Sequence, residues 1–360
     1  MCYKWAGRTA AHCLASGLDD YPRGLMINDD ECHLDLHSWM TLFAGTMASF
    51  CRQLTSWHSS DGQTAALCDA PGWAQRAATL NATLHEVFVG SSKGSGVPLA
   101  DFMGDQPVAK GGRVMVVPPW RTDGRCGPQF PTERGPGDCD PYGGSPCCSP
   151  SGWCGGSPDF CNCQGCRRCL KLEERQGLLK TKPYHSPHLG YVSLFPLGLG
   201  LLPCDHPRAR QLLEALKPGS ADGTGGGKLW SRHGVMSLSS QDPLFRQGED
   251  YWRGKVWANL NYLTISALSR CASHPDPAVK ELAGQAHASL REGFVSTVLQ
   301  ALKKQRFFFE NFDPDTGQGT GVGPFTGWTT LVALVMADLP LALDDQQLPA
   351  DGREGQAAEL

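Results

Sequence analysis

Nine of the sixteen cysteines lie between Cys126 and Cys169, and this cluster constrains the fold more than any other feature of the sequence. The segment contains too few apolar residues to form a hydrophobic core, so covalent bridges must replace one. Closely spaced cysteines also suit zinc, for which the candidate ligands are Cys161, Cys163, Cys166 and Cys169. No pair of CxxC units with a long separation is present, which favours disulfides. The chain therefore divides into a stapled insert and two flanking parts.

The composition favours a globular protein and limits its partners. Of the 360 residues, 41% are hydrophobic and 19% are charged, which is enough apolar material for a core outside the insert. The net charge of −4 provides no basic surface for nucleic acid and no polybasic membrane patch. The cysteine count indicates an oxidising compartment, yet the segment Met1–Arg8 lacks the apolar core of a signal peptide. We therefore expect the natural N-terminus to lie upstream.

Apolar residues at helical spacing predict an all-α fold outside the insert. The first helix should open at the N-caps Asp29 and Asp30 and run to about Leu54. Its three- and four-residue spacing predicts a buried stripe of Leu36, Trp39, Met40, Phe43, Met47 and Phe50. Further helices are expected at 63–88, 189–196, 209–216 and 277–305, and two more should end at about Cys271 and at Met336. The residues after Pro340 should form a disordered tail.

A short acidic loop, Ser16–Arg23, is the first candidate site. Gly17 permits a sharp turn and Pro22 forbids helix before it, so Asp19 and Asp20 are presented on irregular backbone. Functional side chains often lie on such loops, but an ordinary exposed turn would have the same composition.

A second carboxylate, Glu310, follows three phenylalanines near the end of the long predicted helix. Apolar surroundings disfavour its charged form unless it has a partner, which is a common way to tune a catalytic carboxylate. Aromatic residues between Tyr251 and Tyr262 suit a sugar subsite or the core, with Trp257 and Tyr262 the more core-like.

Acidic and histidine residues after the loop have an ordinary explanation beside a functional one. Glu31 and Asp35 suit the positive end of a helix, and this does not exclude a place in the pocket wall. His33 and His37 share a helical face, but no third ligand of suitable spacing follows, so a metal site is not expected.

Taken together, these stretches resemble the processing α-glucosidase I branch of glycoside hydrolase family 63. The match covers nearly the whole chain except the insert and the tail. The stretches that carry it are Trp5–Arg8, Ser16–Arg23, Glu31–Leu36, Tyr251–Tyr262, Glu310–Phe312 and Phe325–Trp328.

The resemblance implies an (α/α)6 toroid, here incomplete, because the family's membrane anchor, β-sandwich domain and first half of the toroid have no counterpart in this sequence. The expected division is a first toroid part at 1–123, the insert at 124–170, a second toroid part at 171–340 and a tail at 341–360. The prolines that the family carries before Tyr251 are replaced by Glu249 and Asp250.

The resemblance also implies an activity. Family members remove the terminal α-1,2-linked glucose from the Glc3Man9GlcNAc2 N-glycan of nascent glycoproteins in the endoplasmic reticulum, with inversion and without a metal or cofactor. Asp19 matches the general acid and Glu310 the general base. Substrate-binding positions are expected at Arg23, Glu31, Asp35, Tyr251, Trp252, Arg253, Asn261 and Trp328.

The insert resembles a hevein-type chitin-binding module, whose sugar platform would be Ser149, Trp153 and Phe160, with Ser151 where an aromatic residue is usual. An N-acetylglucosamine oligomer is the partner that this implies, and the alternatives are a purely structural insert or a sugar-binding protein with an inactive glycosidase part. The family pairing would join Cys126 to Cys148, Cys139 to Cys154 and Cys147 to Cys161, and would leave the last bridge open among Cys163, Cys166 and Cys169.

Overall fold

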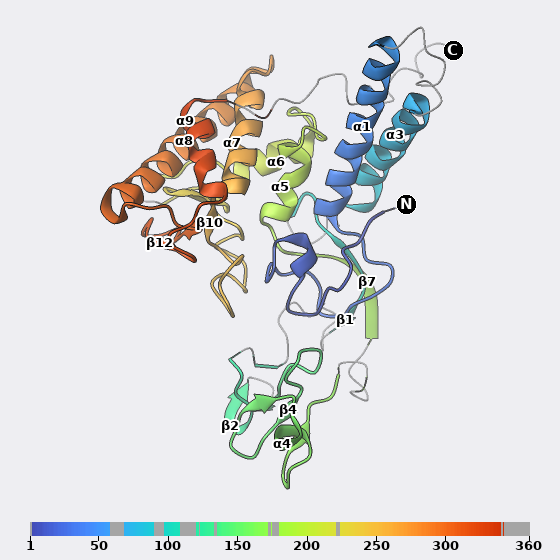
Figure 1. Cartoon of the computed structure of the whole chain (residues 1–360), viewed down its shortest axis with the longest axis vertical. Helices are drawn as coiled ribbons and strands as arrows, with labels where there is room; N and C mark the ends of the chain where they lie inside the picture. The colour runs from blue at the N-terminus through green and yellow to red at the C-terminus, as the bar shows by residue number, and fades with distance from the viewer. Residues whose placement is uncertain are drawn as a thin grey trace.

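The structure is a computed structural model, in which the flanking parts are helix-rich and the insert hangs from them on a pair of strands (Figure 1). It describes residues 2–57, 68–89, 97–108, 120–121, 123–132, 135–171, 174, 180–220, 224–339 and 341.

The helices pack side by side in a row. In spatial order α3 contacts α1, α1 contacts α5, α5 contacts α7 and α7 contacts α8, so that α3 and α8 lie at opposite ends (Figure 1). The shorter helices α6 and α9 pack against α8. The bounds are α1 (Leu34–Trp57), α3 (Ala70–Val87), α5 (Tyr191–Gly198), α6 (Pro207–Ala215), α7 (Ala258–Ala272), α8 (Pro277–Gln305) and α9 (Val332–Met336). One large hydrophobic core joins most of these helices.

Local signals explain why the longest helix lies where the sequence predicts it. The Asp276 side chain accepts hydrogen bonds from the backbone N–H groups of Ala278 and Val279, and Pro277 occupies the first turn. Arg306 ends the helix in the left-handed conformation, at φ 69°. Both ends are therefore fixed by residues adjacent to the helix in sequence.

The predicted start of α1 is wrong. The helix begins at Leu34 rather than after Asp30, and Cys32 instead forms a β-bridge with Phe102. The cap comes from a distant residue, since the Asp101 carboxylate accepts a hydrogen bond of 2.7 Å from the Leu34 N–H. No sequence pattern near Leu34 predicts that Asp101 caps the helix, because Asp101 lies 67 residues away.

The predicted buried stripe of α1 is also wrong. Trp39, Phe43 and Phe50 are 44–49% exposed. Beyond its first turn the helix buries mostly small residues, including Ala44 and Ala48, which let α1 approach α3 and α5 closely. The spacing of the hydrophobic residues therefore predicted the helix correctly but predicted the wrong face to be buried.

Short antiparallel strands connect the helix ends. The strands β10 (Val256–Trp257), β11 (Asn311–Phe312) and β12 (Gly319–Thr320) form one small sheet, and β8 (Trp230–Ser231) pairs with β9 (Gly234–Val235). The first sheet brings two predicted site segments together, because Trp257 pairs directly with Asn311.

The insert is attached through β1 (Phe102–Val108) and β7 (Lys180–His185), which pair antiparallel (Figure 1). Within the insert the elements are short: β2 (Gly127–Thr132), β3 (Gly135–Gly137), β4 (Cys147–Cys148), β5 (Cys154–Gly155), α4 (Pro158–Cys161) and β6 (Arg167–Arg168). Its described hydrophobic cluster consists of cysteines, as expected of a module stapled by disulfides.

The insert contains the three bridges that the hevein resemblance implies, Cys126–Cys148, Cys139–Cys154 and Cys147–Cys161. A fourth bridge joins Cys163 to Cys166 and leaves Cys169 as a buried thiol. Three cysteine sulfurs that lie close enough for a metal all belong to disulfides, so they are not free to act as ligands. Three further bridges staple the flanking parts, namely Cys2–Cys32, Cys51–Cys68 and Cys204–Cys271.

Among the described residues, no helix combines the length and apolar character needed to cross a bilayer. The predicted tail after Pro340 lies outside the described residues except for Leu341, as does the beginning of the second predicted helix before Cys68.

Candidate active site

The acidic loop is folded by its own backbone. A single turn of 3-10 helix, η1 (Leu14–Ser16), ends at Gly17, whose φ of 70° is in the left-handed region that glycine favours. The Cys13 N–H then donates to the Asp19 carbonyl at 2.7 Å, which closes the loop. As a result Asp19 remains partly exposed while its neighbour Asp20 is buried.

Asp20 anchors the loop to a second segment 231 residues away in sequence. Its carboxylate accepts hydrogen bonds from the backbone N–H groups of Trp252 at 2.6 Å and Tyr251 at 3.2 Å. The Asp20 carbonyl accepts a third from Arg253 Nε at 2.8 Å. Both carboxylate oxygens are therefore engaged, which leaves Asp19 as the available carboxyl of the pair.

Glu310 occupies a tight turn before β11 and is 7% exposed. The Tyr251 hydroxyl donates to Glu310 Oε1 at 2.6 Å, and the Val322 N–H donates to Oε2 at 3.1 Å. A Cβ on Gly321 would lie 2.4 Å from Oε2, so the turn needs a glycine there. The carboxylate is held in one orientation by donors on both of its oxygens.

Tyr251 joins the two carboxyl-bearing segments. Its backbone N–H binds Asp20 and its hydroxyl binds Glu310, so one residue spans the space between them. Burial first, and then the negative charges of Glu310, Asp19 and Asp20, raise the pKa of Tyr251 well above its ordinary value. The phenol therefore stays protonated and can donate to Glu310 at any physiological pH.

The pKa of Asp19 is raised above its ordinary value. Burial is the largest cause, followed by the negative charges of Asp20 and Glu249, while His12 acts in the opposite direction. This is the direction that a general acid requires, because the proton must be retained nearer to neutral pH.

Three predicted binding residues, Arg23, Glu31 and Asp35, lie in buried ion pairs. Arg23 donates to Asp35 Oδ2 at 2.6 Å and to Asp101 Oδ2 at 2.6 Å, with all three side chains almost fully buried. Glu31 pairs with Arg8 and accepts a 3.2 Å hydrogen bond from His33 Nε2. These contacts fix the acidic loop on the start of α1, so the group supports the site rather than presenting free polar atoms.

Most of the predicted aromatic and amide residues are also buried. Trp252 stacks on Trp257 with centroids 3.7 Å apart, although of these two residues only Trp257 was expected to be core-like. Asn261 is fully buried and accepts a hydrogen bond from the Val235 N–H. Trp328 is half-buried, and its indole N–H donates to the Glu310 carbonyl at 2.9 Å, so it steadies the turn that carries the carboxylate.

In the insert, Trp153 is 45% exposed and Phe160 is half-buried. The Arg125 guanidinium lies 3.3 Å from the centroid of the Trp153 ring and covers one of its faces. Ser149, 9% exposed, hydrogen-bonds the hydroxyl of Ser151 at 2.9 Å. The three platform positions are thus present, with one aromatic face occupied by the protein itself.

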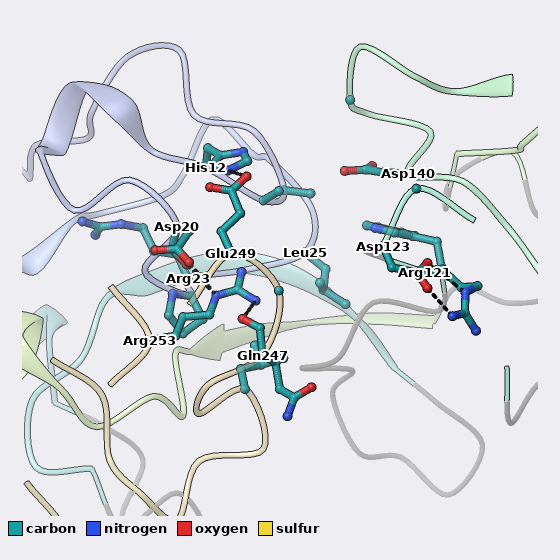
Figure 2. A pocket seen from close by; sticks show the side chains of 18 of the residues that line it. His12, Asp20, Arg23, Leu25, Arg121, Asp123, Asp140, Gln247, Glu249 and Arg253 are labelled. Atoms are coloured by element: carbon teal, nitrogen blue, oxygen red, sulfur yellow. Dashed lines mark hydrogen bonds and ion pairs between the residues drawn. The ribbon is translucent and has the colours of Figure 1, made fainter. Parts of the chain in front are cut away.

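A cleft of about 570 Å³ lies beside the acidic loop (Figure 2). Asp20, Arg253, His12 and Glu249 line it on one side, and residues of the insert line it on the other. His12 Nε2 and Glu249 Oε1 are hydrogen-bonded at 2.9 Å on the first side of the cleft. Neither Asp19 nor Glu310 is among the lining residues, so the cleft adjoins the carboxyl pair without containing it.

Several site residues were not predicted. Asp101 caps α1 and pairs with Arg23, but nothing near it in sequence marks either function. Arg8 belongs to a stretch that resembles the family, but the sequence predicted no function for it, and it pairs with Glu31. Glu249 stood out as a departure from the family's prolines, but nothing in the sequence marked its contact with His12.

A comparison with family models identifies one family. The model of the glycosyl hydrolase family 63 C-terminal domain matches residues 1–70 and 168–338, which flank the insert. The chain is 30% identical over 336 residues to the "Probable mannosyl-oligosaccharide glucosidase" of Schizosaccharomyces pombe and 24% identical over 340 residues to the "Mannosyl-oligosaccharide glucosidase" of Saccharomyces cerevisiae. In both cases the alignment covers 93% of this chain but only 30% of the relative.

Among solved structures, a family 63 mannosylglycerate hydrolase from Thermus thermophilus in complex with Tris is 25% identical, with a TM-score of 0.30. The match covers 44% of this chain and 32% of that one.

Proposed function

Because the chain belongs to glycosyl hydrolase family 63, we propose that it is the acid–base part of an inverting α-glucosidase that acts on glucosylated high-mannose N-glycans. The substrate we propose is the terminal α-1,2-linked glucose of Glc3Man9GlcNAc2, in line with the names of the yeast relatives. The observation that carries the proposal is that Tyr251 connects the Asp19–Asp20 loop to Glu310. Tyr251 contacts Asp20, which lies 231 residues before it, and Glu310, which lies 59 residues after it.

In this mechanism Asp19 is the general acid. Its raised pKa favours the protonated form, which can pass a proton to the glycosidic oxygen as the bond to the anomeric carbon breaks. Glu310 is the general base. The hydroxyl of Tyr251 and the N–H of Val322 orient its carboxylate toward a water on the opposite face of the sugar. Inversion requires the two carboxyls to stand about 6.5–9.5 Å apart so that this water fits between them.

Other residues serve binding and support in the proposal. Arg253 donates to the Asp20 carbonyl and Trp328 to the Glu310 carbonyl, and both would contact the sugar. The buried pairs of Arg23, Asp35 and Glu31 would act as positioning residues for the acidic loop.

We also propose the architecture and setting that the family implies. The row of helices would be part of an (α/α)6 toroid, divided into 1–123 and 171–340 around the insert at 124–170, with a tail at 341–360. Seven disulfides among the described residues suit an oxidising compartment, and the proposed glycan is made in the endoplasmic reticulum.

The test is glucose release from Glc3Man9GlcNAc2 by the purified chain. We expect Asp19→Asn to lower the rate by about 100-fold or more, because a positioned general acid contributes that much when the leaving group is a poor one. Asp30→Asn makes the same replacement of a carboxylate by an amide at an exposed aspartate, and it should leave the rate unchanged. Equal rates for Asp19→Asn and the wild type would rule out the assignment of the acid.

A second candidate function is binding of chitin-like sugars by the insert. Trp153 favours it, because nearly half of its surface is exposed next to Ser149. Retention of the chain on chitin beads should fall on Trp153→Ala, and failure of the wild-type chain to bind the beads would remove this candidate. Because Arg125 covers one face of the ring, we expect Arg125→Ala to strengthen retention.

A further inference from the structure

Besides its attachment through β1 and β7, the insert has a second contact with the flanking parts, next to the acidic loop. Trp120, at the entrance to the insert, packs with Leu25 in a small hydrophobic cluster of its own. Tyr142 joins this cluster, with its ring centroid 5.7 Å from that of Trp120. Leu25 lies two residues beyond Arg23, so the insert is fixed directly beside the candidate active site.

Between these contacts lies the cleft of about 570 Å³, which is within the range of about 300–1,000 Å³ typical of ligand sites. Figure 2 shows Asp140 of the insert, with Asp123 and Arg121 of the segment that leads into it, on one side of the cleft, and His12 and Glu249 of the flanking parts on the opposite side. A site shared between two structural units is a common place for a ligand.

The cleft borders the acidic loop that carries the proposed acid. His12 acts electrostatically on Asp19, on one side, and on Asp140, on the insert side. Asp20, the neighbour of the proposed acid, is itself a lining residue. A chain of sugars bound at Asp19 would therefore meet this cleft as it leaves the reacting centre.

The charges of the cleft favour a neutral ligand. Its arginines are already engaged by carboxylates: Arg253 with Asp20, Arg121 with Asp123, and Arg23 with a buried aspartate pair. His12 is likewise engaged, by Glu249. A phosphate or carboxylate ligand would have to displace one of these partners, whereas sugar hydroxyls can bind beside them as both donors and acceptors.

Asp140 is the insert residue best placed to contact such a ligand. Its Oδ1 accepts a hydrogen bond of 2.9 Å from the Tyr142 N–H, which fixes the side chain, and its carboxyl group points into the cleft in Figure 2. Burial raises the pKa of Asp140, which indicates a partly desolvated carboxyl. A hydroxyl that donates to such a group forms a strong, charge-assisted hydrogen bond.

We propose that this cleft is a subsite for the non-reacting arms of a neutral oligosaccharide, with the insert as one of its walls and Asp140 as a direct contact. The inference rests on the proposed glycosidase function and adds to it a determinant of substrate size. The insert would thereby select branched, extended glycans over short ones.

A blocking variant tests the subsite. Gly144 lines the cleft, and a Cβ built on it meets no atom within 4 Å, so Gly144→Phe introduces a large side chain at the cleft without a clash at its Cβ. Gly284 on α8 has equally open space and does not line the cleft, so Gly284→Phe is the matched control. Asp140→Asn keeps an oxygen acceptor for the Tyr142 N–H, removes the charge and replaces the second oxygen with an NH2 donor.

The measurement is the ratio of kcat/KM for Glc3Man9GlcNAc2 to that for an α-1,2-linked glucose disaccharide. We expect Gly144→Phe to lower the ratio by about tenfold and Asp140→Asn by about threefold, both through KM, with Gly284→Phe unchanged. A wild-type ratio in Gly144→Phe, with glucose still released, would overturn the subsite and leave the proposed function standing.

Calorimetric titration of the same glycan separates the two proposals. If the wild-type chain binds the glycan without cleaving it and Gly144→Phe loses the binding, the subsite stands and the proposed function fails. If the wild-type chain neither cleaves nor binds the glycan, both fail.

Discussion

Asp19 and Asp20 are adjacent in sequence but have opposite surroundings. Asp20 is 1% exposed, and its carboxylate accepts two backbone N–H donors. Asp19 has no such pair of donors among its described contacts, and nearby negative charges act on it. Two carboxyls with separate environments can serve separate functions, here an anchor and a proton donor.

The pH dependence of activity should report the charges around Asp19. A general acid works while protonated, so the rate should fall as the pH rises through the pKa of Asp19. Glu249→Gln removes a charge that raises this pKa, so the alkaline limb should move to lower pH, by roughly half a unit. His12→Gln removes an opposing influence and should move the limb to higher pH.

The pair of variants supplies its own control, because the two shifts have opposite signs and both residues lie on the same wall of the cleft. Shifts of the same sign, or an alkaline limb unmoved by either variant, would contradict Asp19 as the acid. The measurement is the pH profile of kcat/KM for glucose release.

At the scale of elements, the start of α1 depends on buried charge pairs rather than on local capping. Asp101 connects three parts of the molecule, since its carboxylate binds both the Leu34 N–H and Arg23. Glu31 and Arg8 connect the segment before the helix to the N-terminal loop that contains Arg8. Breaking one member of a buried pair leaves the other without a partner, which costs more than the pair contributes.

Stability in acid should reveal the Glu31 contacts. Although burial alone would raise it, hydrogen bonds from His33 and Arg8 lower the pKa of Glu31 from 4.5 to about 2. The unfolded chain binds the proton more tightly, so this contribution is present above about pH 4.5 and is lost as the pH falls toward 2. The difference corresponds to about 3 kcal/mol of unfolding free energy.

We therefore expect Glu31→Gln to be less stable than the wild type at pH 7 and to lose less stability than the wild type between pH 5 and pH 3. Urea unfolding at several pH values measures this, with Glu292→Gln, an exposed change on α8, as the control. If the stability of Glu31→Gln fell with pH as steeply as that of the wild type, the ionised Glu31 network would not be the cause.

At the scale of the whole molecule, sequence patterns predicted those features that are determined by residues close together in the chain. The long helix α8 and its caps follow from Asp276 and Pro277, and the clustered cysteines announced a stapled insert. Glu310 among phenylalanines correctly indicated a buried carboxylate, which is 7% exposed.

Contacts between distant segments could not be predicted in the same way. The start of α1 depends on Asp101, and the exposed aromatic face of α1 depends on which of its two faces meets α3 and α5. The docking of the insert through Trp120 and Leu25 brings together segments 95 residues apart, and no local pattern encodes it. That docking places the insert wall of the cleft.

The central claim is that Asp19 and Glu310 form one inverting site, and the configuration of the first product tests it most directly. Proton NMR during hydrolysis of Glc3Man9GlcNAc2 by the purified chain distinguishes α- from β-glucose before they equilibrate. A carboxylate that activates water on the face opposite the leaving group must give β-glucose from an α-linkage. We predict β-glucose as the first product, whereas α-glucose first, or no glucose at all, would contradict the account.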